Sequence, residues 1–283
     1  PSPSAEALSH SNQLKDIMHA AIAQEGGALP FAKYMELALY YPGLGYYSAG
    51  ARKFGAEGDF VTAPELGGGF AYVLANAGAT LLEQLDASAV WFEIGAGTGA
   101  LAEKTLLRLQ EIGQLPAQYW ILEPSADLRE RQRETLEQVV PHLLPRVQWL
   151  DSLPDEPFVG MILANEVLDA LTIERFALRG GEVNALGVSS EFGQLQLAEV
   201  RAASRLVAAV RRIEADSGIA LPDGYESEVC TGLAPWFESI AYSLERGVLL
   251  FIDYGLPRRE YYSAERTRGT LLCHFRHRFH EDA

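Results

Sequence analysis

Short apolar runs alternate with amphipathic segments through the middle of the chain. The apolar runs have the length of buried strands, and the segments between them carry apolar residues at helical spacing. Strands that alternate with helices in this order are typical of a parallel sheet covered by helices. The pattern therefore predicts a doubly wound α/β sheet, with strands at residues 89–94, 118–123, 147–150, 160–164 and 248–252.

The segments outside these strands follow other patterns. Residues 1–12 are small and polar and are expected to form a loose tail, whereas helical spacing predicts helices over residues 14–25 and 31–40. Around Gly180-Gly181 the period changes to that of a hairpin, and a helix is expected after it. We therefore expect a helical cap with a lid loop (1–85), a ligand-binding core (86–170), an inserted hairpin and helical subdomain (171–247) and the fifth strand with an incomplete end of the core (248–283).

Composition narrows the classes of partner. The 283 residues carry a formal net charge of −15, so phosphate backbones are repelled and no nucleic-acid partner is expected. The chain has only Cys230 and Cys273, which predicts no disulfide framework. No apolar run is long enough to cross a membrane, and no signal pattern is visible. We expect a cytoplasmic protein without membrane insertion.

The first predicted strand ends in a carboxylate and a glycine-rich turn, Glu93-x-Gly95-x-Gly97-x-Gly99. Glycine allows a tight turn and a close approach of the backbone to a ligand. Because Gly95, Gly97 and Ala100 also satisfy the dinucleotide fingerprint, an NAD site stays open. Glu93 would repel the pyrophosphate of NAD, but it would attract the amino group of a methionyl moiety. The turn therefore favours S-adenosyl-L-methionine.

Acidic residues also end the second and third predicted strands, where the ligand of such a sheet lies. Glu123 is expected to accept both ribose hydroxyls of an adenosine, and Asp151 to accept from the adenine amino group. The alternative is that Glu123 and Asp151 bind no ligand and are simply polar residues that keep their loops in contact with solvent. The spacing of His274, His277 and His280 suggests a metal site, but they lie partly on a strand and lack clear Cys or carboxylate co-ligands. No metal is expected.

Several motifs, spread over nearly the whole chain, together resemble the MidA-type family, which is related to the mitochondrial complex I assembly-factor arginine methyltransferase. This resemblance implies a Rossmann-like class I fold, S-adenosyl-L-methionine as cofactor and N-methylation of an arginine in a protein, a respiratory complex I subunit above all. In a eukaryote it implies the mitochondrial matrix. The motifs lie at residues 31–40, 45–47, 58–65, 93–99, 165–170, 253–255 and 269–273.

Residues after the fourth strand are the expected catalytic group. A guanidinium is a poor nucleophile because its lone pair is delocalised and its pKa is above about 12. Glu166 and Asp169 could orient it and accept its proton, and Asn165 could bridge cofactor and substrate. A helix N-cap is the alternative role of Asp169. By the resemblance, the loop at residues 58–65 closes over the cofactor, with Asp59 or Thr62 reaching it.

Other functions stay open at this point. They are methylation of a small molecule, an NAD-dependent oxidoreductase, and an assembly factor that binds the donor without turnover. The chain also departs from the family pattern in two places. Leu66-Gly67-Gly68-Gly69-Phe70 replaces the usual helix start after residues 64–65, and the sequence stops at residue 283, well before family members end. We therefore expect the chain to be C-terminally incomplete.

Overall fold

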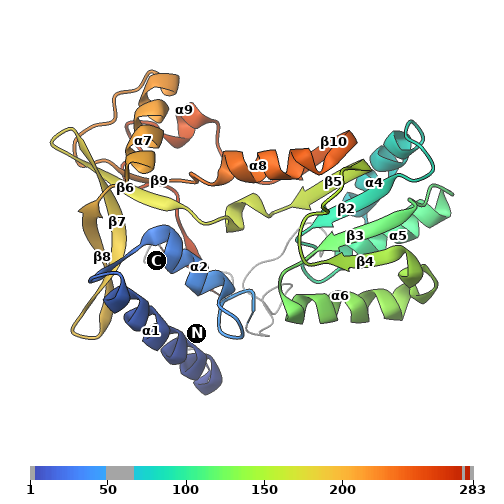
Figure 1. Cartoon of the computed structure of the whole chain (residues 1–283), viewed down its shortest axis with the longest axis horizontal. Coiled ribbons are helices and arrows are strands. Elements are labelled where there is room, and N and C mark those ends of the chain that lie inside the picture. Colours follow the sequence, from blue (N-terminus) through green and yellow to red (C-terminus); the bar gives the residue numbers. More distant parts are fainter. Residues whose placement is uncertain (1–3, 49–66, 276–277, 281–283) are drawn as a thin grey trace.

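The computed structural model describes residues 4–48, 67–275 and 278–280. Its centre is the predicted parallel sheet, in which neighbouring strands pair in parallel. The strand order places the glycine-turn strand β2 in the middle of the sheet (Figure 1). The order is β10 (Leu244–Ile252), β5 (Phe158–Asn165), β2 (Val90–Ile94), β3 (Gln118–Leu122) and β4 (Val147–Leu150).

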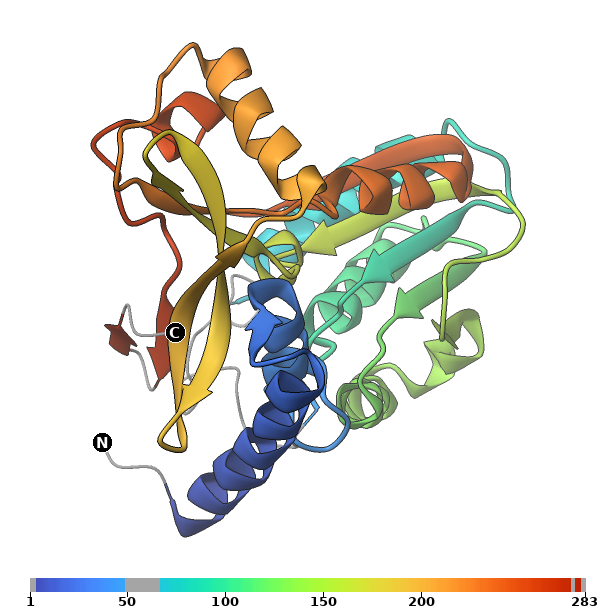
Figure 2. The same ribbon diagram turned by 60° about the vertical axis from the view of Figure 1, so that its left-hand side comes forward.

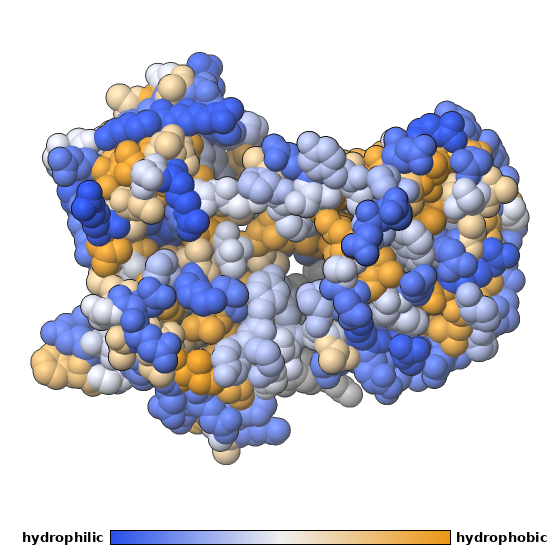
Figure 3. Space-filling model, viewed as in Figure 1, coloured by the Kyte–Doolittle hydropathy of each residue, from blue (hydrophilic) through white to orange (hydrophobic). Residues whose placement is uncertain are grey.

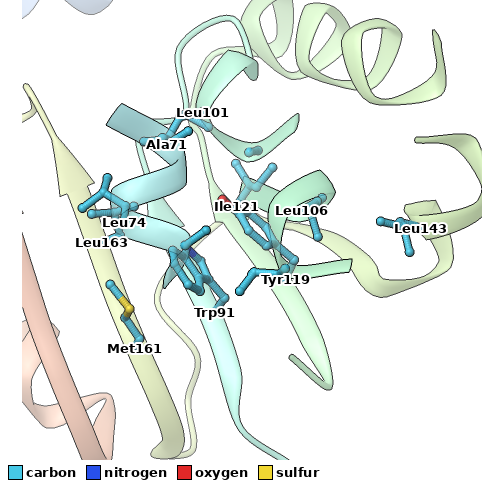
Figure 4. Close-up of a cluster of buried hydrophobic side chains, with 14 of the residues drawn as sticks. Ala71, Leu74, Trp91, Leu101, Leu106, Tyr119, Ile121, Leu143, Met161 and Leu163 are labelled. Atoms are coloured by element: carbon cyan, nitrogen blue, oxygen red, sulfur yellow. The ribbon is translucent and has the colours of Figure 1, made fainter. Parts of the chain in front are cut away.

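Helices cover both faces of this sheet, as the alternating pattern predicts. One face packs against α4 (Gly69–Leu82), α5 (Ala100–Glu111) and α6 (Ala126–Val139), and the other against α8 (Leu233–Tyr242). Figure 4 shows the first of these cores, in which Trp91 lies between Met161 and Tyr119. The Trp91 and Tyr119 rings are fully buried, with centroids 6.1 Å apart. This core fixes the sheet under the glycine turn.

An antiparallel second sheet forms a separate layer (Figures 1 and 2). Apolar residues of α7 (Ser204–Ser217) pack against one of its faces, and α1 (Ala5–Gln24) and α2 (Phe31–Tyr40) pack against the other. Most of the sheet comes from the predicted insertion. Its strands are β1 (Ala28–Pro30), β6 (Glu174–Arg179), β7 (Glu182–Glu191), β8 (Gln194–Arg201) and β9 (Glu226–Val229).

Three local expectations were wrong. The predicted tail is helical from Ala5, because the Ser4 hydroxyl caps the backbone N–H of Ala7 at 3.1 Å. The strand predicted at 248–252 already begins at Leu244, because Leu244 pairs with Phe158 of β5. Strand β9 was missed, since its polar sequence carries no apolar alternation. Its pairing with β6 holds it in the sheet.

Short elements complete the chain. A 3-10 helix, η1 (Pro141–Arg146), precedes β4, and another, η2 (Leu168–Ala170), follows β5. After β10 come α9 (Arg258–Tyr261) and a hairpin of β11 (Cys273–Phe275) and β12 (Arg278–His280). Within the described ranges, no helix is both long and apolar enough to cross a membrane.

Candidate functional site

A cavity of about 480 Å³ lies at the carboxyl ends of β2, β3 and β5. Figure 3 shows the molecule hollowed between the second sheet and the parallel sheet, with hydrophobic residues along the upper rim of the hollow. The cavity is the place that a doubly wound sheet offers to a ligand. Seven residues predicted from the sequence line it: Glu93, Gly95, Gly97, Glu123, Asn165, Glu166 and Asp169.

The glycine turn brings main-chain atoms to the cavity wall. Gly95, Gly97 and Gly99 have φ angles of +68°, +55° and +84°, the left-handed region that glycine adopts without strain. A Cβ on Gly95 would lie 2.9 Å from a methyl carbon of Val167. Gly99 does not line the cavity but is the N-cap residue of α5. A side chain on Gly95 would therefore be strained and would press on Val167, which also lines the cavity.

Glu93 is a buried carboxylate at the end of β2. Its side chain is 2% exposed, and the Tyr119 hydroxyl donates to Oε2 at 2.5 Å. Burial raises the pKa of Glu93 to about 7, while the Tyr119 hydrogen bond lowers it and the charge of Glu123 raises it. A cation in the cavity would stabilise the ionised form of Glu93.

Glu123 accepts a hydrogen bond at each of its carboxylate oxygens. The backbone N–H of Ser125 donates to Oε1 at 3.0 Å, and the Gln132 side chain donates to Oε2 at 3.2 Å. The same Gln132 amide donates to the Gly97 carbonyl at 3.0 Å. Through Gln132, helix α6 fixes Glu123 and the glycine turn relative to each other.

After β5 the chain passes through a turn, residues 166–170, that carries the other two carboxylates. Glu166 has a φ of +51°, which is strained for a residue with a side chain. Its backbone N–H donates to the Ile252 carbonyl at 2.8 Å. Asp169 lies in η2, and the Tyr254 hydroxyl donates to its Oδ2 at 2.6 Å. Burial raises the pKa of Asp169, and the Tyr254 hydrogen bond opposes this shift.

Aromatic residues form the wall beside these carboxylates, and the sequence-based site did not include them. The Tyr40 and Tyr47 rings are stacked, with centroids 5.6 Å apart and planes 22° apart. Burial and the charges of Asp169 and Glu123 raise the pKa of Tyr40 to about 12. The Tyr40 hydroxyl donates to the Ala170 carbonyl at 2.7 Å, and Trp236 of α8 also lines the cavity. The motif at residues 45–47 is the one sequence signal that could have pointed to Tyr47.

The remaining predicted residues lie elsewhere. Asp151 does not line the cavity; its carboxylate is 93% exposed and pairs with Arg129 at 2.8 Å. Glu228 of β9 is buried and accepts hydrogen bonds from Tyr261 and Thr270 in the C-terminal segment. Asp59 and Thr62 lie outside the described residues. In the part of the chain that the structure describes, no group of three or more potential ligands gathers for a metal.

Solved structures resemble the whole of this chain. One, from Burkholderia thailandensis, contains bound S-adenosyl-homocysteine; it is 42% identical, superposes with a TM-score of 0.91 and covers 100% of this chain and 72% of its own. A native structure of a protein from the same organism is 40% identical with a TM-score of 0.87, covering 100% and 71%. The predicted class I methyltransferase fold is confirmed by these similarities.

Curated relatives are more distant. The mitochondrial "Protein arginine methyltransferase NDUFAF7 homolog" of Drosophila melanogaster is 26% identical over 90% of this chain and 63% of the relative. Its counterpart in Caenorhabditis elegans is 28% identical over 63% of this chain. The chain thus spans 63% and 46% of the lengths of these relatives.

A family model covers most of the chain. The family described as "Putative S-adenosyl-L-methionine-dependent methyltransferase" matches residues 73–283, which include the glycine turn, Glu123 and the turn at 166–170. The family predicted from the sequence motifs is confirmed, and the dinucleotide alternative gains no support. The chain belongs to this family of S-adenosyl-L-methionine-dependent methyltransferases.

Proposed function

We propose that this chain carries the methyl-transfer site of a protein arginine N-methyltransferase. The main support is that Glu166 and Asp169 lie beside stacked tyrosines, in the same cavity as the glycine turn. The curated relatives carry the name of protein arginine methyltransferases, which favours the same acceptor. A complex I subunit is the acceptor class that follows from the resemblance.

The cavity suits the cofactor in size and in chemistry. Glu93 offers a buried negative charge to the ammonium group of the methionyl moiety, and Glu123 offers two oxygens to ribose hydroxyls. Gly95 and Gly97 of the turn line the same cavity, where the backbone can approach the ligand. When bound, S-adenosyl-L-methionine supplies a methyl group on a sulfonium, which is already a good leaving group.

The acceptor end suits a flat cation. The carboxylates of Glu166 and Asp169 can accept N–H bonds from a guanidinium, and the Tyr40 and Tyr47 rings offer aromatic faces to it. A guanidinium nitrogen must lose a proton as it becomes methylated. Because burial raises the pKa of Asp169, this carboxylate can hold that proton better than an ordinary aspartate.

The test replaces Glu166 by Gln and leaves the shape of the site unchanged. We expect methyl transfer to an arginine-rich peptide to fall by about 100-fold, since the carboxylate orients the acceptor only when charged. The affinity for S-adenosyl-L-methionine, measured by calorimetry, should stay within about threefold, because Glu93 and Glu123 are intact. Glu182→Gln, on an exposed residue of β7, is the matched control and should leave both unchanged.

Three results would contradict the proposal. If the Glu166→Gln variant transferred methyl groups as fast as the unchanged protein, Glu166 would not have the role assigned to it. Transfer by the unchanged protein to small molecules but to no arginine would indicate another acceptor. Binding of NADH without binding of S-adenosyl-L-methionine would indicate an oxidoreductase.

A further inference from the structure

The turn at residues 166–170 is held by the residues that follow β10. Asp253 Oδ2 accepts the backbone N–H of Leu168 at 2.8 Å and that of Asp169 at 3.2 Å. Its other oxygen accepts the backbone N–H of Tyr254 at 2.9 Å. The two bonds to Leu168 and Asp169 join parts of the chain that are 85 and 84 residues apart in sequence.

The Asp253 carboxylate satisfies donors that η2 cannot satisfy itself. The first N–H groups of any helix lack a partner within that helix, and η2 has only three residues. Asp253 therefore acts as a cap supplied by a distant strand. The strained φ of Glu166 lies just before η2, and such strain persists only where surrounding atoms fix the backbone.

Tyr254 acts on the carboxylate itself. Its hydroxyl donates to Asp169 Oδ2 at 2.6 Å, while the residue as a whole is 72% exposed. The ionisable groups that influence this region are Glu166 of the same turn, Asp253 beside Tyr254, and Tyr40 and Tyr47 on the cavity wall. No basic side chain among the described residues forms an ion pair with Asp169, so the Tyr254 hydroxyl is its charge-stabilising side-chain partner in that part of the chain.

We infer that Asp253 and Tyr254 are positioning residues: Asp253 fixes the backbone of the turn at 166–170, and Tyr254 fixes the carboxylate of Asp169 toward the acceptor. The part of this inference that concerns the acceptor rests on the proposed function. Neither residue lines the cavity, so both act through the turn that does.

The first test compares Tyr254→Phe with Tyr242→Phe, a control on a tyrosine that is 81% exposed in α8. Loss of the Tyr254 hydroxyl removes a hydrogen bond that lowers the pKa of Asp169, so this pKa should rise. Asp169 then stays protonated to higher pH, and the acid limb of the methyl-transfer profile should move to higher pH. We expect kcat to fall about tenfold with little change in the KM of S-adenosyl-L-methionine.

The second test is a series at Asp253. Asn keeps an oxygen that can accept a backbone N–H, whereas Ala keeps none. We expect kcat to be highest in the unchanged protein, lower in Asp253→Asn and lowest in Asp253→Ala. The Asn variant should therefore keep part of the activity that the Ala variant loses. Asp155→Asn, on an exposed loop residue, is the matched control and should behave like the unchanged protein.

A measurement without turnover separates this inference from the proposed function. The NMR signal of the Asp169 carboxyl carbon is assigned as the one that is absent from the spectrum of Asp169→Asn. Its chemical shift is then followed as a function of pH in the unchanged protein and in Tyr254→Phe. A higher titration midpoint in the Tyr254→Phe variant supports the inference, whether or not an arginine is methylated. A lack of arginine methylation would contradict only the proposed function. An unchanged midpoint, with a pH profile that superposes on that of Tyr242→Phe, would overturn the role of Tyr254. Equal activity of the Asp, Asn and Ala proteins at 253 would overturn the role of Asp253.

Discussion

At the residue scale, Glu93 links the charge inside the cavity to what occupies it. It ends the central strand, is 2% exposed, and its pKa is raised to about 7 chiefly by burial. Near neutral pH, much of the ligand-free protein therefore carries a proton on this carboxyl. A ligand ammonium would favour the ionised form, so binding and loss of the proton are coupled.

The first prediction concerns the pH dependence of cofactor binding. As the pH rises from about 6 to 8, the affinity for S-adenosyl-L-methionine should increase, because less free energy is needed to ionise Glu93. Calorimetry in buffers with different ionisation enthalpies should detect a released proton. The Glu93→Gln variant should bind more weakly and lose this part of the pH dependence. An identical pH dependence in both proteins would contradict the assignment.

The same shift has a consequence for stability without ligand. The folded pKa of Glu93 lies above its ordinary value, so the unfolded chain loses this proton first as the pH rises. Stability should therefore fall between about pH 4.5 and 7. The thermal midpoint of the unchanged protein should decrease over this range more than that of Glu93→Gln. A steeper decrease in the variant would show that the sign of the shift is wrong.

At the element scale, the packing of α4 on the parallel sheet depends on a glycine within the helix. A Cβ on Gly78 would lie 2.3 Å from Cζ3 of Trp91 and 3.1 Å from the sulfur of Met161. Trp91 is fully buried, so its ring has no room to move. Glycine usually weakens a helix by about 1 kcal/mol relative to alanine, but here it permits close contact with the sheet.

The next prediction compares two glycines of α4. Gly78→Ala should destabilise the protein by about 1–3 kcal/mol, as overpacking does. Gly69→Ala, at the first residue of the same helix, meets no atom within 4 Å and should be neutral or slightly stabilising. Urea unfolding with a comparison of midpoints checks both. Equal midpoints would mean that α4 can move away from Trp91 without cost.

At the scale of the whole molecule, the cavity lies at a junction of distant segments. The glycine turn and Glu123 come from the parallel sheet, Tyr40 from α2, and Trp236 from α8. The chain around this junction carries a formal net charge of −15. Such a molecule attracts a basic peptide over distances comparable with the Debye length, and salt screens this attraction.

The last prediction uses this screening. For a peptide acceptor flanked by Lys and Arg, kcat/KM should fall about tenfold when salt rises from about 50 to 500 mM, while kcat changes little. A peptide with the same arginine and neutral flanks is the control and should show a much weaker dependence. The same salt dependence for both peptides would assign the effect to the site rather than to the charge of the molecule.

Much of this structure could be predicted from local sequence. Apolar strands that alternate with helices predicted the parallel sheet, and the spacing of Gly95, Gly97 and Gly99 predicted the ligand-binding turn. Glu93 and Glu123 could be named as cavity residues because each ends a strand at the same edge of the sheet. Strand period, helix period and glycine turns depend on neighbouring residues, so the sequence alone determines them.

Other features depend on contacts between distant residues, and only the tertiary structure decided them. Asp151 also ends a strand, but its exposed side chain forms an ion pair with Arg129 and does not line the cavity. Tyr40 reaches Ala170, and Asp253 caps η2, across 130 and 85 residues of sequence. A side chain's neighbours follow from how elements pack, and no local pattern records that packing. The sequence therefore determined the sheet and the glycine turn, whereas packing decided which side chains surround the acceptor end of the cavity.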